Sequence, residues 1–480
     1  MYNYFFIQIK KTDDKYKKQV YNCVGCLSMT KTKTVDMTNG PFAGNMIKFA
    51  LPLIFTGLLQ LLYNTADSVV VGKFAGNEAL AAVGSTGSLV NLIVNLFVGL
   101  SMGSGVIAAR FLGAGDKKRI HRCVHTAMSI SLVCGVIMMV VGFFFAKTFL
   151  RLMNSPENVI DLSTLYLKIY FLGAPGSLVY NFGASILRAS GDTKKPLYIL
   201  LFSGIVNVIL NLILVIPFKM SVSGVAIATI VSQYISAVMI VIFLMKDKGD
   251  IRLSLKALRF YKVELKSILR LGIPAGLQNA LFSVSNVIIQ SAVNNFGDIA
   301  MAGIAAGSNF DSYVYTCTNA IGQTSMTFSS QNIGAGKPQN VKRVYRNAFL
   351  MTLIIGSVLS WLGFFFREPL VGIFSSDPEV IEIGAQRLAL IMPFYVLCSL
   401  QDTAGCQIRG MGKSIEPMTI SLIGVCGIRI FWVFAILPMM YSLINLYWAY
   451  PISWFVTLVA QSVLIVITQK QLDKKYSLAT

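Results

Sequence analysis

Asp67 is the residue whose type and surroundings point most directly to chemistry. It lies in an apolar stretch at 47–72 and shares one helical face with Gln60 and Asn64, because the spacings are i, i+4 and i+7. An ionised carboxylate near the middle of a bilayer costs roughly 2.5–3.5 kcal/mol, so this face is expected to turn away from lipid. Among amide and hydroxyl oxygens, a carboxylate can hold a proton or coordinate a small hard cation. It can also be a packing residue that accepts hydrogen bonds from the amides.

Polar side chains that would complete a cation site lie in other apolar stretches. Asn207 and Asn211, at i and i+4, share a helical face, and Thr229 lies in the stretch that follows. We therefore expect these side chains to gather around the Asp67 carboxylate. The expected cation-coupling residues are Asp67, Asn64, Asn207, Asn211, Thr229 and Asn181.

Polar and aromatic residues elsewhere in the apolar stretches are candidates for lining a substrate cleft, with ordinary helix packing as the alternative. The candidates are Gln60, Tyr63, Asn91, Asn95, Tyr180, Gln278, Asn309, Asp311, Asp402 and Arg429. A buried Arg429 needs a partner, and Asp402 or Asp311 is the nearest available type. An ion pair there would be either structural or functional.

The loop motifs of this chain recur at one fixed offset. Gly113 and Arg188 belong to motifs that return at Gly334 and Arg409, and both 334−113 and 409−188 equal 221. Two motifs that move together indicate a duplicated unit of two homologous halves, rather than a solenoid of short repeats.

The two halves diverge in their intramembrane chemistry. Adding 221 to Asn207 and Asn211 reaches Ile428 and Trp432, so the amide pair has no counterpart in the second half. Asp402 repeats the position of Asn181, since 402−181 is also 221. We therefore expect the two halves to share a scaffold. Only one of them is expected to carry the coupling ion, that is, the proton or small cation that Asp67 would bind.

The composition indicates a membrane protein. With 55% hydrophobic and 13% charged residues and a mean hydropathy of +0.66, a soluble protein would expose far too much apolar surface. Stretches of ~20 apolar residues can cross the hydrocarbon core, and they must be helical because lipid offers no backbone partners. The expected spans are 47–72, 79–110, 121–150, 160–189, 195–217 and 222–246, then 268–295, 299–331, 343–374, 380–408, 415–438 and 441–469.

The predicted fold is an all-α integral membrane protein with about twelve transmembrane helices in two pseudo-symmetric six-helix lobes. Because six is even, the halves form a parallel repeat about an axis along the membrane normal. The expected parts are a disordered cytoplasmic tail at 1–40, an N-lobe at 41–246, a cytoplasmic linker at 247–267, a C-lobe at 268–470 and a cytoplasmic tail at 471–480.

The distribution of Lys and Arg predicts the orientation in the membrane. Basic residues concentrate in the loops of one side, and such loops stay cytoplasmic, so both termini are expected in the cytoplasm of a cell with this protein in its inner membrane. The formal charge of +20 is spread over short loops that face anionic lipid headgroups, which argues against nucleic-acid binding. The basic and apolar residues of 246–270 predict an amphipathic helix on the membrane surface, or alternatively a solvated tether.

The residues that bind metals or do covalent catalysis are sparse. Cys23 and Cys26 form a lone C-x-x-C without a second ligand pair, and no disulfide framework is implied. His121 and His125 are the only histidines, and they lie near a basic loop without obvious ligands. We therefore expect neither a metal site nor a catalytic residue nor a cofactor, which disfavours a membrane enzyme.

Three motifs together resemble the multidrug and toxic compound extrusion (MATE) family. They are Leu-Tyr-Asn-Thr-Ala-Asp-Ser-Val-Val-Val-Gly at 62–72, Leu-Arg-Ala-Ser-Gly-Asp at 187–192 and its echo Ile-Arg-Gly-Met-Gly-Lys at 408–413. The resemblance covers about residues 35–470. It implies two six-helix lobes in a V around a central cavity, and a monomer that exports organic, often cationic, compounds by alternating access. Export would be driven by H⁺ or Na⁺.

Within that family, Asp67 resembles the first-span Asp of the prokaryotic DinF-like branch. The branch's fifth-span partners map onto Asn207 and Asn211, although its second position there can be Asp, which puts the ion stoichiometry in question. Another branch uses a Glu in the seventh span and an Asp in the tenth, where this chain has Phe282 and Cys398. Asp402, one helical turn further along, is a candidate substitute.

A flippase for lipid-linked saccharides is the alternative from the same broad superfamily. It would be favoured by additional spans and by a cationic groove for a pyrophosphate headgroup, and the sequence shows about twelve spans and few intramembrane basic residues. For a transporter in the membrane, the expected partners are small organic substrates and membrane lipids.

Overall fold

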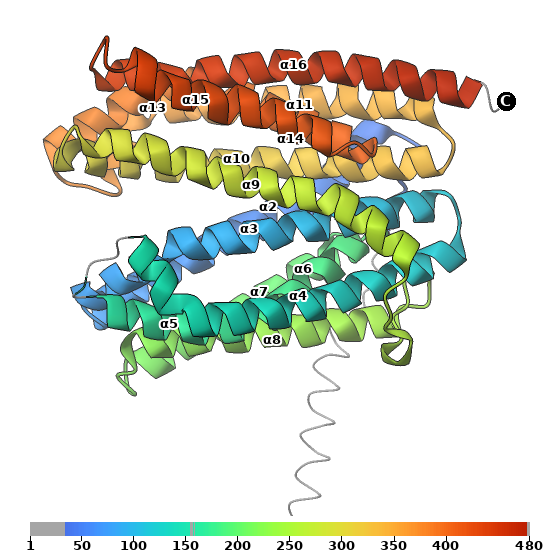
Figure 1. Cartoon of the computed structure of the whole chain (residues 1–480), viewed down its shortest axis with the longest axis horizontal. Coiled ribbons are helices and arrows are strands. Elements are labelled where there is room, and N and C mark those ends of the chain that lie inside the picture. The colour runs from blue at the N-terminus through green and yellow to red at the C-terminus, as the bar shows by residue number, and fades with distance from the viewer. Residues whose placement is uncertain (1–33, 154–156, 158, 478–480) are drawn as a thin grey trace, which may run out of the picture. The chain divides into compact units, whose positions relative to one another are not determined.

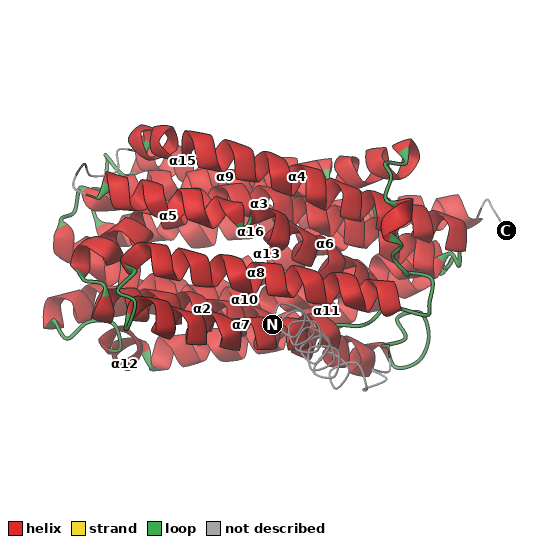
Figure 2. Cartoon of the chain, turned by 90° about the horizontal axis from the view of Figure 1, so that it is seen from below, coloured by secondary structure: helices red, strands yellow, loops and turns green. Residues whose placement is uncertain are grey.

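The computed structural model describes residues 34–153, 157 and 159–477, and the described part is built of helices joined by short loops (Figure 1 and Figure 2). We call the helices before residue 247 the N-lobe and those from residue 262 onward the C-lobe. The N-lobe consists of α2 (Phe42–Phe74), α3 (Asn77–Gly113), α4 (Lys117–Leu152), α5 (Ile160–Leu172), α6 (Ala174–Ala189), α7 (Lys194–Val215) and α8 (Ser221–Lys246).

The C-lobe follows a short 3₁₀ turn, η1 (Leu255–Ala257). It consists of α9 (Lys262–Asn294), α10 (Asp298–Gly334), α11 (Pro338–Phe365), α12 (Arg367–Gly372), α13 (Pro378–Gly410), α14 (Ile415–Ser421), the π-helix η2 (Leu422–Gly427), α15 (Ile428–Phe431), the π-helix η3 (Trp432–Ile436) and α16 (Leu443–Ser477). The run from α14 to η3 forms one continuous span, 415–436.

Nine helices of the described chain are long and apolar enough to cross a membrane. Their outward faces are apolar, as Phe144, Ile354 and Phe434 illustrate with 71%, 62% and 72% exposure. Three further segments complete six per lobe. The pair α5 and α6 is broken at Gly173, and α9 and α10 carry more polar residues because parts of their surfaces face other helices rather than lipid.

Paired glycine turns confirm the duplication of the chain. Glycines with left-handed backbone conformations recur at an offset of 221, and the φ values within each pair differ by only a few degrees. A left-handed φ favours glycine because it has no Cβ. The pairs are Gly76 (φ 90°) with Gly297 (94°), Gly115 (66°) with Gly336 (69°) and Gly191 (92°) with Gly412 (96°).

Glycines also let the two lobes approach closely. An added Cβ at Gly99 or Gly103 of α3 would collide with the backbone of Gly276 or Gly272 of α9. Small residues at such crossings allow close packing between membrane helices, where no hydrophobic force drives association. The crossing of α3 and α9 therefore joins the lobes through backbone contact.

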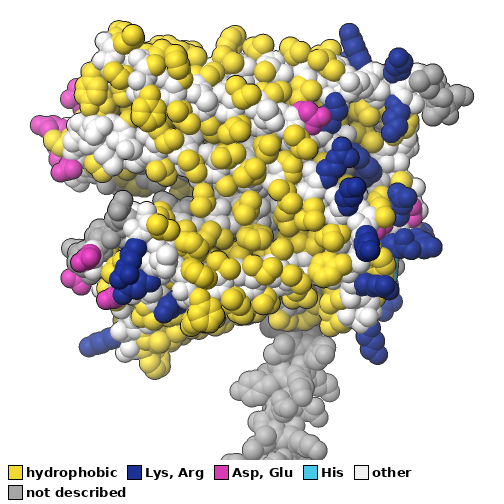
Figure 3. Space-filling view, in the orientation of Figure 1, with side chains coloured by type: hydrophobic (Ala, Val, Ile, Leu, Met, Phe, Trp, Pro, Cys, Tyr) yellow, Lys and Arg dark blue, Asp and Glu magenta, His cyan; other side chains and the backbone are white. Residues whose placement is uncertain are grey.

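Lys and Arg gather at the end of the molecule where α16 ends, which we call the basic end (Figure 1 and Figure 3). At the opposite end, the space-filling surface is hollowed between the two lobes (Figure 3). The lobes therefore meet at the basic end and separate toward the other end.

Several boundaries differ from those that the sequence predicts. The expected span 343–374, for example, corresponds to α11, Pro338–Phe365, followed by the short α12. Helix α9 begins at Lys262, inside the expected linker 247–267, because its basic residues lie on an exposed face and do not stop the helix. Helix α16 continues to Ser477, past the expected end of the C-lobe at 470. The expected fourth span, 160–189, is interrupted at Gly173.

The last residues of the expected disordered tail are ordered. The Val35 amide donates to the Gly191 carbonyl of the N-lobe at 3.2 Å, and Asn332 of the C-lobe donates to the Met37 carbonyl at 2.7 Å. Met37 is buried because it packs into an apolar cluster with α2, α10 and α11. This segment therefore links both lobes at the basic end, whereas residues 1–33, with Cys23 and Cys26, lie outside the described residues.

Candidate functional site

Asp67 of α2 faces the amide pair of α7. The Asn211 side-chain amide donates to the Asp67 carboxylate at 2.5 Å and to the Asn207 side-chain oxygen at 3.3 Å. Asn207 and Asn211 are buried, at 5% and 0% exposure. Their i, i+4 spacing on α7 presents both amides to α2, as the sequence pattern predicts.

Asp67 has no cationic partner among the residues that the structure describes, since none of their ion pairs includes it. An uncompensated carboxylate in a low-dielectric interior is costly. A proton or a bound cation would offset that cost.

Tyr63 fixes the relative position of α2 and α7. Its ring occupies the space that a side chain at position 204 would need, and its hydroxyl donates to the Leu201 carbonyl at 3.3 Å. Gly204 is thus required by close approach, because any Cβ there would overlap the ring. Asp67 lies one turn after Tyr63 on α2, so this contact keeps the Asp67 carboxylate at the level of the amide pair on α7.

A cavity of about 580 Å³ lies between the lobes, within the range typical of sites for small organic ligands. Its walls come from α2, α3, α5, α6, α7 and α8 of the N-lobe and from α10 of the C-lobe. The expected residues that line it are Gln60, Tyr63, Asn64, Asp67, Asn91, Asn95, Tyr180, Asn181, Asn207 and Thr229. Asn211 lies behind this wall, where it contacts Asp67.

Hydrogen bonds to nearby backbone orient several of these lining residues. The Asn181 amide donates to the Ser177 carbonyl at 2.9 Å, and the Thr229 hydroxyl donates to the Val225 carbonyl at 2.9 Å. Tyr180 spans two helices, because its hydroxyl donates to the Pro196 carbonyl at 3.1 Å. None of these bonds joins Asn181 or Thr229 to Asp67, so they contribute to the cavity wall rather than to its carboxylate contact.

The C-lobe candidates Gln278, Asn309, Asp311, Asp402 and Arg429 do not line this cavity. Gln278 accepts a hydrogen bond from Arg409 at 2.8 Å. The exposed Asn309 donates to the Ala305 carbonyl of its own helix at 3.2 Å. The first of these bonds joins α9 to α13, whereas the second stays within α10.

The partner of Asp311 is Arg387, which the sequence reasoning did not identify. The Arg387 guanidinium lies 2.5 Å from the Asp311 carboxylate, and the Tyr395 hydroxyl donates to the Asp311 carbonyl at 3.0 Å. The available signal is a charged residue inside the predicted span 380–408. Position 387 has no basic counterpart in the first half, where Tyr166 stands 221 residues earlier, so the repeat gives no further clue.

The expected ion pair of Arg429 with Asp402 or Asp311 is wrong. The Arg429 guanidinium donates to Ser453 at 3.3 Å and to Asn286 at 3.2 Å, and it lies 4.4 Å from the centre of the Tyr450 ring. Hydroxyl, amide and aromatic groups on α16 and α9 replace the carboxylate, and Asp311 pairs with Arg387 instead.

A chain of hydrogen bonds links Asp402 to the N-lobe. Asn319 donates to the Asp402 carboxylate at 2.8 Å, and Gln323 donates to the Asn319 side-chain oxygen at 2.7 Å. Arg188 of α6 in turn donates to Gln323 at 3.5 Å across the lobes. Asn319, Gln323 and Arg188 line the cavity, so Asp402 is connected to it indirectly.

Sequence reasoning missed Asn319 and Gln323 as cavity residues. Their spacing of i, i+4 on α10 was the available signal, and it continues the polar stripe that starts with Tyr315. Stripes of this kind occur on several helices of the chain, so spacing alone does not show which of them faces the other lobe.

The structure offers no cluster for metal or covalent chemistry among its described residues, where no group of three or more His, Cys, Asp or Glu gathers. His125 serves a structural contact, because its buried ring accepts a hydrogen bond from the Ser254 amide at 3.0 Å.

Comparisons with known proteins agree with this architecture. The chain is 29% identical over 393 residues to the probable multidrug resistance protein YoeA of Bacillus subtilis (strain 168), covering 80% of this chain and 85% of the relative. It is 26% identical to the probable multidrug resistance protein NorM of Thermotoga maritima, covering 80% and 83%. A solved structure described as the outward-facing conformation of a multidrug resistance MATE family transporter of the MOP superfamily aligns with a TM-score of 0.85 at 21% identity, covering 93% of this chain and all of that one.

The family model called MatE matches residues 52–213 and 274–434, one segment in each lobe. The two matches cover well over half of the chain and coincide with the two halves of the repeat. Members of this family are transporters rather than enzymes. The chain therefore belongs to the MatE family, the multidrug and toxic compound extrusion transporters that its motifs resemble.

Proposed function

We propose that this protein is a cation-coupled antiporter that exports organic, often cationic, compounds by alternating access. The observation that carries the proposal is Asp67, which lines the interlobe cavity, accepts a hydrogen bond from Asn211 at 2.5 Å and has no basic partner among the described residues. Relatives named as multidrug export proteins, such as MepA of Staphylococcus aureus, support the class of substrate.

The coupling ion is H⁺ or Na⁺, and both suit the oxygens near Asp67. A proton would neutralise the carboxylate directly, whereas Na⁺ would take oxygen ligands from the carboxylate and from neighbouring amides such as Asn64 and Asn207. An ion drives transport only if it binds the two lobe arrangements with different affinity. The affinity of Asp67 for the ion would differ between the two arrangements if α2 moves relative to α7 during the transport cycle.

The cavity suits an organic cation. Tyr63, Tyr170 and Tyr315 expose aromatic surface to it, and aromatic faces attract cations. The Asp67 carboxylate adds negative charge on the same wall. The ion and the substrate would therefore compete for the negative charge of the same carboxylate. This competition is the basis of exchange.

Positive-inside asymmetry makes the basic end cytoplasmic. Both termini would then lie in the cytoplasm of a cell whose inner membrane holds the protein as a monomer. With the lobes in contact at the basic end, this conformation faces outward, the state in which substrate leaves and the ion binds. The N-lobe, linker and C-lobe would move as separate bodies around the α3 and α9 crossing.

The test is efflux of a fluorescent organic cation from proteoliposomes under a pH gradient or, separately, a Na⁺ gradient. Efflux by the wild-type protein should follow one of the two gradients, and Asp67→Asn should remain folded and lose gradient-driven efflux.

Asp161→Asn is the matched control, because the Asp161 side chain is 85% exposed and pairs with Lys147 outside the cavity. Full gradient-driven efflux in Asp67→Asn would contradict the proposal. If a folded wild type moves no tested compound under either gradient, the lipid-linked saccharide flippase becomes the better hypothesis.

A further inference from the structure

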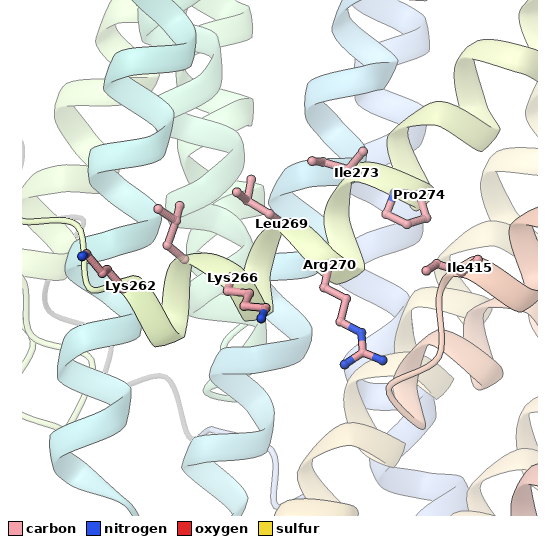
Figure 4. A pocket seen from close by; sticks show the side chains of 8 residues that line it. Lys262, Lys266, Leu269, Arg270, Ile273, Pro274 and Ile415 are labelled. Atoms are coloured by element: carbon pink, nitrogen blue, oxygen red, sulfur yellow. The ribbon is translucent and has the colours of Figure 1, made fainter.

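A groove of about 550 Å³ runs along the outer face of α9 at the basic end, on the C-lobe side (Figure 4). It lies outside the interlobe cavity and shares no residue with it. Three basic side chains, Lys262, Lys266 and Arg270, line it at spacings i, i+4 and i+8. They form a single row on one face of the helix.

The rest of the groove is apolar. Leu265, Leu269 and Ile273 form a second row beside the basic one, and the groove ends against Pro274 and Ile415 of α14 (Figure 4). Ile273 and Ile415 are 48% and 51% exposed, so their hydrocarbon surfaces are open for contact. A basic row beside an apolar row matches an amphiphile that has an anionic head and a hydrocarbon tail.

The three basic side chains are not neutralised within the part of the chain that the structure describes. No carboxylate among the described residues forms an ion pair with any of them. The nearby Glu416 lies 3.8 Å from Lys413 instead, and Glu264 of the same helix is buried at 2% exposure. The groove therefore presents uncompensated positive charge to its ligand.

The position of the groove favours a lipid as its ligand. Beyond Ile273, the exposed Leu277 continues the apolar face of α9 toward the middle of the membrane span, away from the basic end. An acyl chain can follow this face while the phosphate stays near the basic row, at the level where lipid headgroups lie. A free phosphate ion would use the basic row alone and leave the apolar row unoccupied.

We propose that this groove binds an anionic phospholipid, with its phosphate at Lys262, Lys266 and Arg270 and an acyl chain against Ile273 and Ile415. A buried side of the same helix segment carries Gly272 and Gly276, which contact α3 of the N-lobe. The bound lipid therefore adds contacts to the helix that holds the lobes together at the basic end. The inference concerns binding and does not depend on the exported compound or its coupling ion.

The test measures which lipid stays on the purified protein. The full chain is reconstituted into bilayer nanodiscs of equal phosphatidylglycerol and phosphatidylcholine and then extracted into detergent, and native mass spectrometry gives the ratio of the two retained lipids. Each basic residue near a membrane surface contributes about 1 kcal/mol toward anionic lipid. Replacing all three with glutamine (K262Q, K266Q, R270Q) should therefore lower the preference for phosphatidylglycerol by about 10-fold or more.

A charge-matched control removes three other exposed basic residues from the same end of the molecule, at the start of α11 (K342Q, R343Q, R346Q). This control should change the lipid ratio by less than about threefold, because those residues line neither this groove nor the interlobe cavity. Equal losses in both triple variants would overturn the proposal, since they would indicate general electrostatic adsorption.

A second variant tests the apolar part of the groove without changing its charge. Ile415→Trp fills the end of the groove and should reduce retained phosphatidylglycerol, whereas inorganic phosphate added in excess should not displace the lipid. Unchanged retention in Ile415→Trp, or displacement by phosphate, would contradict binding of a whole lipid. Thermal unfolding in detergent confirms that each variant is folded.

Discussion

Gly113 of the N-lobe and Gly334 of the C-lobe lie 221 residues apart and make the same contact with the opposite lobe. An added Cβ at Gly113 would overlap the Gln331 carbonyl, and one at Gly334 would overlap the Arg110 carbonyl. Gln331 is itself 221 residues after Arg110, so the contact obeys the pseudo-symmetry of the chain. The repeated glycine motif thus closes the two lobes on each other at the basic end.

A larger side chain at this contact should loosen the closed end. We expect Gly113→Val to lower the stability of the closed arrangement by about 1–3 kcal/mol, as overpacking typically does, and therefore to lower the unfolding temperature. Gly84→Ala is the control, because no atom lies within 4 Å of a Cβ at Gly84. Equal unfolding temperatures for Gly113→Val and wild type would show that the contact carries no strain.

Loss of the Asn211 amide should change the affinity of Asp67 for its ion. Hydrogen bonds to charged groups are worth about 1.5–3 kcal/mol, and this one favours the ionised carboxylate over the protonated one. If the coupling ion is H⁺, Asn211→Ala should therefore lower the H⁺ concentration needed for half-maximal efflux by about 10-fold or more. The same efflux assay with a series of ion gradients measures this. Asn64→Ala is the comparison, because Asn64 lines the cavity without a hydrogen bond to Asp67 among those found. An equal effect of both variants would mean that Asn211 has no special role.

The Asp311 and Arg387 pair should behave as a buried structural ion pair. Their side chains are 17% and 4% exposed, and breaking such a pair typically costs about 3–5 kcal/mol because one charge is left uncompensated. We expect Asp311→Asn to lower the unfolding temperature strongly, and the double variant Asp311→Leu with Arg387→Met to recover much of the loss. Thermal unfolding of the single and double variants in detergent gives the coupling. Additive losses would show that the two side chains do not act as a pair.

Acid should release the segment that precedes α2. Burial alone would raise the pKa of Asp36, but hydrogen bonds from Thr38 and Asn39 hold it below the ordinary value of 3.8. A carboxyl group with a lowered pKa stabilises the folded state above the ordinary value and loses that effect as the pH falls through the lowered one. Amide hydrogen exchange in residues 36–45 should therefore accelerate below about pH 3.8, beyond the intrinsic change with pH.

The variant Asp36→Asn provides the control for this pH effect. It should exchange faster at neutral pH and show no additional acceleration in acid, since the titrating group is gone. An unchanged pH dependence in the variant would assign the effect to another group.

Local sequence patterns predicted much of the fold. Composition and apolar stretch length indicated membrane helices, and the offset of 221 predicted two equivalent lobes because duplicated sequences repeat their turns. The spacing of Asn207 and Asn211 identified a polar face, and the structure places that face against Asp67. These predictions depend on residues close in sequence, where helical periodicity alone determines which side chains share a face.

The tertiary structure alone decided which faces meet. It paired Asp311 with Arg387 rather than with Arg429, and it brought Asn319 and Gln323 to the cavity wall. Each of these choices depends on how two helices distant in sequence pack, and close packing follows the shapes of whole surfaces. Periodicity gives the direction of a side chain on its own helix, whereas its partner depends on the contacts of every helix in the lobe.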